Sequence, residues 1–341
     1  MTWQEQHPPA EHPAVRSGRV GVLLVNLGTP DDHAPKAVKR YLAEFLSDPR
    51  VIEIPQAVWQ VILRGVILNV RPRKSAEAYR QVWTEEGSPL AAITRAQAAK
   101  LGGRLAADGV RVDYAMRYGN PSIASRLTAL KDAGCERILL APLYPQYCAA
   151  TTATAVDKAA DSLRKIRWQP TMRTLPPYHD DPAYIDALAA DLGTQMDALP
   201  FTPEVLLLSF HGMPERTLHL GDPYHCHCRK TARLLGERLH RPGLRIDTTF
   251  QSRFGPAKWL TPATDDTLKA EGAAGIKRLA VAAPGFAADC VETLEELAIA
   301  GREQFEEAGG EEYAVLSCLN AREAGMQMLE TMVRRELAGW I

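Results

Sequence analysis

The sequence has no excess of charge of either sign and none of the common nucleotide-binding or nucleophile motifs. Its 341 residues carry 40 Lys and Arg against 41 Asp and Glu, a formal net charge of −1, and aromatic residues make up 7%. Without a basic stripe, this composition predicts a protein that does not bind nucleic acid. The absence of a Walker A loop, a GxGxxG turn and a GxSxG elbow argues against phosphate chemistry and serine hydrolysis.

Long hydrophobic runs are also absent. The longest apolar-leaning stretch, residues 57–70, contains Arg64 and is shorter than the roughly 20 residues of a membrane span. Residues 1–17 are polar and rich in proline, so we expect a frayed tail and not a signal peptide. The six cysteines do not resemble a disulfide framework and favour a reducing compartment. We therefore expect a cytoplasmic protein, soluble or at most peripheral to a membrane.

Short apolar runs alternate with amphipathic stretches along the chain, which predicts an α/β fold. The runs are rich in Val, Ile and Leu and lack alternation of polar residues, as in parallel strands covered on both faces; they span residues 20–26, 136–142, 205–210, 277–284 and 313–317. A chain of this length exceeds the usual size of a single core, so two domains are expected.

The chain also resembles itself at the ends of these runs. VLLVNLGTP, ending at Pro30, parallels LLLSFHGMP, ending at Pro214, which matches Leu27 with His211. Arg-Tyr-Gly at 117–119 parallels Arg-Phe-Gly at 253–255, and residues 141–152 parallel residues 283–294. We therefore predict two similar Rossmann-like domains with parallel sheets, residues 18–175 and 176–341, with a ligand cleft between them.

The first half carries an insertion, because the chain from Pro30 to Gly119 is more than twice as long as that from Pro214 to Gly255. The inserted region holds Trp59, the apolar stretch 57–70 and a basic group at Arg71, Arg73 and Lys74. One interpretation is an apolar lip with a cationic rim, suited to a flat amphiphile with carboxylates or to peripheral membrane contact. The other is an ordinary helical insertion with a solvated face.

Two groups of residues at strand ends have the chemistry of a metal site. His211 directly follows a buried run, where a histidine can accept a proton or ligate iron, although a structural histidine is equally consistent. Glu292 and Glu296 are four residues apart and share one face if the segment is helical. They form either the acidic first turn of a helix or a carboxylate row that passes a cation and protons.

The segment His-Cys-His-Cys at 225–228 has Cys-x-Cys spacing, which is not typical of structural zinc sites. Two interpretations remain. Cys148, Cys226 and Cys228 could ligate an iron–sulfur cluster with one of Cys135, Cys290 and Cys318, or all six could be reduced structural thiols.

At these segments the chain resembles ferrochelatases, from about Val20 to its end. The family's SFHGxP motif is present as residues 209–214, its FQSRxG…WL block as residues 250–255 and 259–260, and its PGFxxDxxETLEE motif as residues 284–296. The resemblance implies the chelatase fold, two Rossmann-like domains around a porphyrin cleft with the last helix packed back on the first domain. It further implies insertion of Fe2+ into protoporphyrin IX to form protohaem, with iron and porphyrin as substrates and no organic cofactor.

The resemblance also assigns roles to individual residues. His211 and Glu292 match the catalytic, iron-side pair, and Glu296 continues the acidic path. The porphyrin-contacting positions match Arg71, Tyr79, Ser88, Leu27, Trp259 and Phe286, and Arg71 would meet a propionate.

Two positions bear on how this chain differs from its relatives. The apolar side chain of Leu27 favours protoporphyrin over coproporphyrin, for which relatives tend to carry Tyr at this position. Cys290 replaces a histidine that many relatives have.

The alternative functions are those of a chelatase for another metal or for another tetrapyrrole such as coproporphyrin, and of a non-catalytic haem or porphyrin carrier. Whether the protein is a monomer or a dimer is left open.

Overall fold

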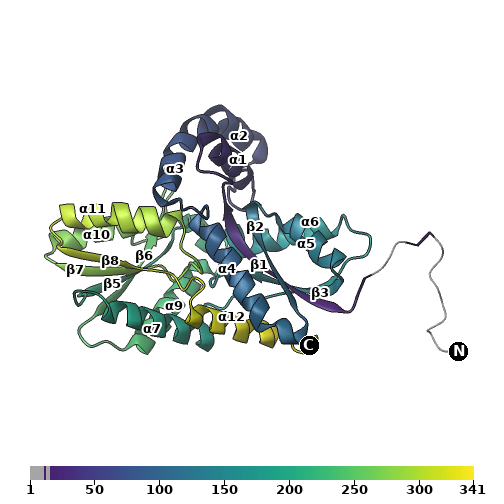
Figure 1. Cartoon of the computed structure of the whole chain (residues 1–341). Helices are drawn as coiled ribbons and strands as arrows, with labels where there is room; N and C mark the ends of the chain where they lie inside the picture. The colour runs from purple at the N-terminus through teal and green to yellow at the C-terminus, as the bar shows by residue number, and fades with distance from the viewer. Residues whose placement is uncertain (1–10, 13–15) are drawn as a thin grey trace.

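Two four-stranded parallel sheets lie side by side in the structure, a computed structural model that describes residues 11–12 and 16–341 (Figure 1). The first has the strand order β2-β1-β3-β4 and the second β6-β5-β7-β8. The strands are β1 (Arg19–Thr29), β2 (Arg111–Gly119), β3 (Cys135–Pro142), β4 (Thr171–Thr174), β5 (Val205–His211), β6 (Arg245–Gln251), β7 (Arg278–Ala282) and β8 (Glu312–Leu316). The predicted α/β fold with two similar parallel sheets is confirmed. The tail expected over residues 1–17 lies largely outside the described residues.

The internal repeat is visible in the strand order, because β1 and β5 occupy the same place in their sheets and end near Leu27 and His211. The second sequence match is wrong. Asn26 of β1 pairs with Met116, and Phe210 of β5 pairs with Phe250, so the structural counterparts of residues 117–119 are residues 251–253. Residues 253–255 lie beyond β6, in an additional loop that leads to α10.

A glycine follows the strand-end position in both halves because the neighbouring strand comes very close. Gly28 has a φ of +116°, and a Cβ atom there would lie 1.9 Å from the carbonyl oxygen of Tyr118. A Cβ atom on Gly212 would lie 2.6 Å from the carbonyl oxygen of Gln251. Neither site has room for a side chain, which explains the shared Gly in the two matching segments.

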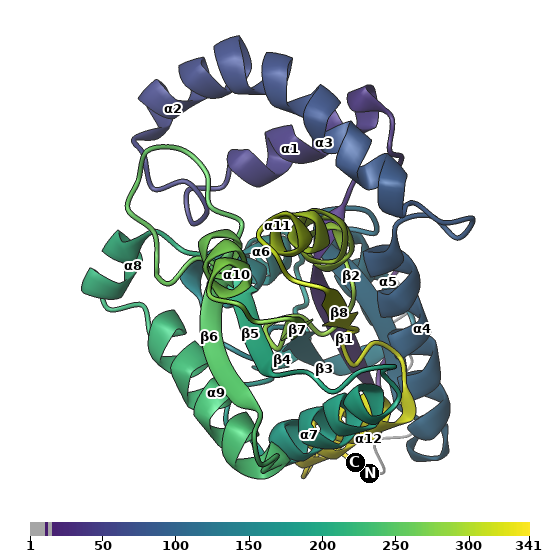
Figure 2. The same cartoon turned by 90° about the vertical axis from the view of Figure 1, so that its left-hand side faces the viewer.

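The inserted segment of the first half forms a separate group of helices above the sheets (Figure 2). It consists of α1 (Pro35–Leu46), α2 (Gln56–Ile62), the π-helix η2 (Leu63–Ile67) and α3 (Leu68–Val82). The helices around the first sheet are α4 (Pro89–Arg104), the short 3-10 helix η3 (Ala106–Asp108), α5 (Ile123–Asp132), the π-helix η4 (Ala149–Ala153) and α6 (Thr154–Leu163).

The second sheet is covered by α7 (Pro182–Asp197), α8 (Glu215–His219), α9 (Tyr224–Leu239), α10 (Thr264–Ala273), the π-helix η5 (Glu292–Ala300), α11 (Gly301–Glu307) and α12 (Glu323–Glu336). The last helix, α12, lies along both α7 and α4 (Figure 1). Ion pairs join it to the α4 region, at 3.0 Å between Arg104 and Glu330 and at 2.7 Å between Arg334 and Asp108.

One large buried cluster connects the two sheets. It includes Leu24 of β1, Leu101 of α4, Leu208 of β5 and Met332 of α12, all essentially inaccessible to solvent. None of the helices in the described part of the chain combines the length and apolar character that a membrane span requires.

Candidate active site

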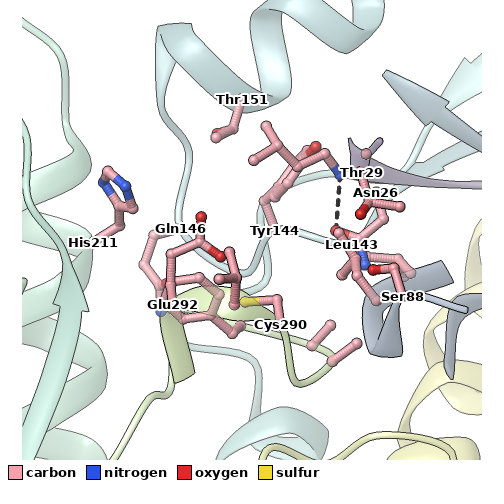
Figure 3. Close-up of a pocket in the computed structure, with 18 of the residues that line it drawn as sticks. Asn26, Thr29, Ser88, Leu143, Tyr144, Gln146, Thr151, His211, Cys290 and Glu292 are labelled. Carbon is pink, nitrogen blue, oxygen red and sulfur yellow. Dashed lines mark hydrogen bonds between the residues drawn. The ribbon is translucent and has the colours of Figure 1, made fainter. Parts of the chain in front are cut away.

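A pocket lies where the carboxyl ends of the two central strands of each sheet meet (Figure 3). Its walls come from the end of β1, the segments after β3 and β7, the end of β5, and the starts of α4 and η5. This is the position at which open parallel sheets bind ligands. Six predicted site residues line it, namely Leu27, Tyr79, Ser88, His211, Phe286 and Glu292.

The imidazole of His211 has a defined orientation at the pocket wall. Its Nδ1 lies 2.7 Å from the carbonyl oxygen of Gly212. Because a carbonyl oxygen can only accept, Nδ1 carries the proton of the neutral ring and Nε2 keeps a free lone pair. The hydroxyl of Tyr224, which also lines the pocket, donates to the carbonyl oxygen of His211 at 2.9 Å. His211 is therefore held with a lone pair available to a proton or a metal ion.

Glu292 begins a π-helix and not the α-helix expected from the spacing of its carboxylates. The nine residues Glu292–Ala300 form η5, and π-helical turns are frequent at functional sites. Two hydrogen bonds hold the start of η5 in place. The Nε2 of Gln251 donates to the carbonyl oxygen of Glu292 at 3.0 Å, and the hydroxyl of Thr293 donates to Asp289 at 3.1 Å.

Glu296 lies behind Glu292, outside the pocket lining. Its carboxylate accepts hydrogen bonds from the backbone N–H of Ser252 at 2.6 Å and from the Ser252 hydroxyl at 2.5 Å. Burial raises the pKa of Glu296, and the charge of Glu292 adds to this, whereas Ser252 and His211 act in the opposite direction. His211 and Glu292 are thus among the residues whose charge acts on the carboxylate of Glu296.

Much of the remaining pocket lining is apolar. Leu27, Leu90, Phe286 and Val291 contribute hydrocarbon surface. Tyr79 is buried beside them, and burial together with the charge of Glu292 raises the pKa of its hydroxyl. Ser88 occupies the N-cap position of α4, but its hydroxyl makes no capping hydrogen bond. An apolar slot bordered by a few hydroxyl groups suits a flat, largely hydrophobic ligand.

Two predicted porphyrin contacts, Arg71 and Trp259, do not line this pocket. The guanidinium of Arg71 lies 5.1 Å from the ring centre of Phe254, and Phe254 lies 4.9 Å from Trp259. Together they form a group where α3 approaches the loop between β6 and α10. Burial lowers the pKa of Arg71, and among the described residues no carboxylate forms a salt bridge with it. A half-buried cation without an acidic partner is a site where an anionic group would be stabilised.

The cysteines do not form the predicted cluster site. All six are free thiols, and Cys226 is exposed whereas Cys148 and Cys228 are buried. Cys226 and Cys228 are two residues apart on α9, so their side chains leave the helix on different faces. Over residues 11–12 and 16–341, no group of three or more His, Cys, Asp or Glu side chains has the arrangement of a metal site. The iron–sulfur interpretation is therefore not supported.

The same finding applies to His211, Glu292 and Glu296, which are not arranged as a closed three-ligand site. Two of them line the pocket and the third is bonded to Ser252. A closed ligand set retains a metal, whereas a metal that is a substrate must be released to its acceptor.

Several pocket residues were missed by the sequence reasoning. They follow β3 and β5 or flank the predicted positions, and include Asn26, Thr29, Tyr144, Gln146, Thr151 and Tyr224. Figure 3 shows Tyr144 and Gln146 between His211 on one side and Ser88 on the other. Residues 144–151 belong to a segment that the repeat had singled out, so the strand-end argument applied to every strand would have found them.

The fold defines the class of the protein as an α/β protein with the chelatase fold. SirB from Bacillus subtilis with Fe3+ has a TM-score of 0.54 and 13% identity, over 93% of this chain and 95% of that one. The sirohydrochlorin chelatase SirB from Bacillus subtilis subspecies spizizenii in complex with cobalt has a TM-score of 0.50 and 10% identity over the same shares. At these identities the likeness concerns the fold alone.

The chain belongs to the ferrochelatase family, whose model matches residues 19–337. The ferrochelatase of Rhizobium meliloti (strain 1021) is 54% identical over 97% of this chain and 98% of its own length. The ferrochelatase of Agrobacterium fabrum (strain C58 / ATCC 33970) is 54% identical over 98% of both chains. The chain is accordingly an enzyme that inserts iron into a porphyrin.

Proposed function

We propose that the enzyme inserts Fe2+ into protoporphyrin IX to form protohaem, and that His211 and Glu292 act on the iron side of the macrocycle. The observation that carries this proposal is their position in one pocket, whose lining also contains the apolar side chains of Leu27 and Phe286. A flat hydrophobic ring would lie against these side chains. Relatives that act on coproporphyrin tend to carry Tyr at the position of Leu27, so the resemblance favours protoporphyrin as the substrate.

In this proposal His211 takes a pyrrole proton on Nε2, because its Nδ1–H is already engaged with Gly212. The neutral porphyrin loses two protons as Fe2+ binds its four nitrogens, so the product is neutral haem and two protons must leave. Glu292 assists His211 in the pocket. Glu296, which lies outside the pocket lining, either receives a proton or releases the iron. Burial raises the pKa of Glu296, so its carboxylate accepts a proton more readily than a solvent-exposed glutamate does.

The polar edge of the porphyrin is assigned to the other predicted residues. Arg71 has no acidic partner in the described chain and would be neutralised by a propionate. Ser88 offers a hydroxyl that its own helix does not use. Tyr79 completes the wall, and Trp259 with Phe254 would cover the outer part of the ring.

The experiment is anaerobic incubation of the purified protein with protoporphyrin IX and Fe2+, followed by porphyrin fluorescence and the haem absorption spectrum. We expect catalytic haem formation, with kcat lowered at least about 100-fold in His211→Ala and Glu292→Gln. Glu307→Gln, an exposed carboxylate at the end of α11, serves as the control and keeps full turnover. Near-normal turnover in His211→Ala would refute the assignment. Tight porphyrin binding without turnover in the parent protein would favour a carrier, and preference for coproporphyrin would overturn the choice of substrate.

We further propose that the outer face of α2, η2 and α3 makes peripheral contact with a membrane. Val58, Val61, Val66 and Val70 are each more than half exposed on this face, which is unusual for neighbouring apolar side chains. Arg64 and Arg73 lie among them and would meet anionic lipid headgroups. The six free thiols agree with a cytoplasmic location.

A further inference from the structure

The start of α9, which contains the His-Cys-His-Cys segment, has no role in the proposed chemistry but lies against the pocket wall. The wall segment follows β3 in the first half of the chain, whereas α9 belongs to the second half. Tyr144, Gln146 and Thr151 of that segment line the pocket. What holds this segment in place therefore influences the shape of the porphyrin site.

Three hydrogen bonds connect the wall segment to α9 and the residues just before it. The side-chain Nε2 of Gln146 donates to the hydroxyl of Thr231 at 3.0 Å. The backbone N–H of Tyr147 donates to Nδ1 of His227 at 3.2 Å. The backbone N–H of Ala149 donates to the Asp222 carboxylate at 2.8 Å. All three acceptors come from the second half of the chain.

Asp222 acts as a helix cap for a helix to which it does not belong. Ala149 is the first residue of η4, and Cys148 at the N-cap position provides no side-chain cap. An exposed N–H at a helix start requires an acceptor, and a carboxylate there also complements the helix dipole. Because the cap comes from across the cleft, the position of η4 depends on the contact between the halves.

His227 accepts its hydrogen bond only as a neutral ring, and its surroundings favour that form. The ring stacks on His179 with centroids 3.6 Å apart and an interplanar angle of 4°. Burial lowers the pKa of His227, and burial together with His227 lowers the pKa of His179 to about 4. Among the other charged groups around the pair, Lys230 also lowers the pKa of both histidines. Asp180 acts to raise the pKa of both, and Asp222 acts to raise the pKa of His227.

The same helix also reaches the opposite wall of the pocket. Tyr224, the first residue of α9, donates its hydroxyl to the carbonyl oxygen of His211, and its N–H donates to Asp222 at 3.0 Å. The start of α9 thus contacts both the wall after β3 and the strand end that carries the proposed base.

We propose that His227 and Asp222 are positioning residues that hold the wall segment 144–151 in the shape that binds porphyrin. Neither residue lines the pocket, so each acts through the segment that it holds. This inference rests on the proposed function, because it takes the ligand of the pocket to be porphyrin.

The test compares His227→Ala with His227→Asn. The alanine variant leaves the N–H of Tyr147 without an acceptor, so we expect KM for protoporphyrin IX to rise about three- to tenfold while kcat stays within twofold. The side-chain oxygen of Asn accepts the same hydrogen bond and should restore KM. Arg229→Ala, an exposed change two residues further along α9, is the control and should leave KM unaltered.

Asp222→Ala is a second, independent test with the same expected rise in KM, and it decides the question if His227→Ala does not fold. Fluorescence titration with protoporphyrin IX in the absence of iron measures binding separately from chemistry. An unchanged KM and binding constant in both alanine variants, or equal defects in the Ala and Asn variants of His227, would overturn the inference. Failure of the parent protein to form haem would instead refute the proposed function.

Discussion

At the scale of single residues, Asp48 shows how a buried carboxylate is kept charged. It accepts hydrogen bonds from the hydroxyl of Tyr118 and the backbone N–H of Arg50, both at 2.8 Å, and pairs with Thr154 and Arg117 at short range. Burial acts to raise the pKa of Asp48, but the hydrogen bonds, with Thr154 foremost, and the charge of Arg117 outweigh it and hold the pKa below its usual value.

A carboxyl whose pKa is lowered by folding stabilises the fold above its unfolded pKa of about 3.9 and loses this effect as the pH falls through the lower folded value. We expect Asp48→Asn to lower the free energy of unfolding by about 3–5 kcal/mol at pH 7, since it leaves Arg117 unpaired. The variant should also lose less stability than the parent when the pH falls below about 4. Urea unfolding at several pH values measures both, and an identical acid dependence would contradict this account.

At the scale of the element, the α2–η2–α3 segment combines a buried and an exposed apolar face. Trp59 and Leu63 pack inward with Tyr79 and Tyr118, and the Nε1 of Trp59 donates to the carbonyl oxygen of Leu46. The opposite face carries Val61 and Val70, exposed by 73% and 68%. Exposed apolar side chains gathered on one helical segment are typical of an interaction surface.

The proposed membrane contact predicts that Val61→Asp combined with Val66→Asp weakens binding to vesicles that contain anionic lipid. The two carboxylates should lower the partition coefficient about tenfold or more, because they remove apolar area and repel the lipid headgroups. Haem formation with detergent-dispersed porphyrin should stay within twofold. Trp168→Asp, at an exposed apolar position between α6 and β4, is the control. Co-sedimentation measures the binding, and equal binding of all variants would exclude this face.

At the scale of the whole molecule, the two halves share one core. The large buried cluster includes β1 and α4 of the first half together with β5, α7, α9 and α12 of the second. Because each half buries part of its apolar surface against the other, we expect one cooperative unfolding transition and not two.

Met332→Ala tests this coupling from the last helix. Met332 is fully buried in the shared cluster, so truncation should cost about 2–5 kcal/mol and lower the Tm of the single transition. Thr331→Ala, its exposed neighbour on α12, should change the Tm little. Calorimetry measures the result, and two separate transitions, with only one of them shifted, would show that the halves unfold independently.

The sequence alone predicted the α/β class and the two similar sheets, and it placed His211 and Glu292 near strand ends; the pairing of these two residues followed from the family resemblance. These predictions depend on local features. Buried parallel strands are continuous apolar runs, and a side chain directly after such a run must emerge at the carboxyl end of the sheet. The glycine that follows Leu27 and His211 in the two halves is needed because the neighbouring strand leaves no space for a Cβ atom.

Only the tertiary structure decided which loops meet and where the outer residues lie. The strand register makes residues 251–253 the structural counterparts of residues 117–119, whereas the similar triplets in the sequence had matched residues 253–255. Arg71 faces Phe254, and Asp222 caps a helix of the other half. Strand patterns result from interactions between near neighbours in the chain. The contacts of Arg71 and Asp222 join residues from opposite sides of the cleft, so these contacts are fixed only when the two sheets pack against each other.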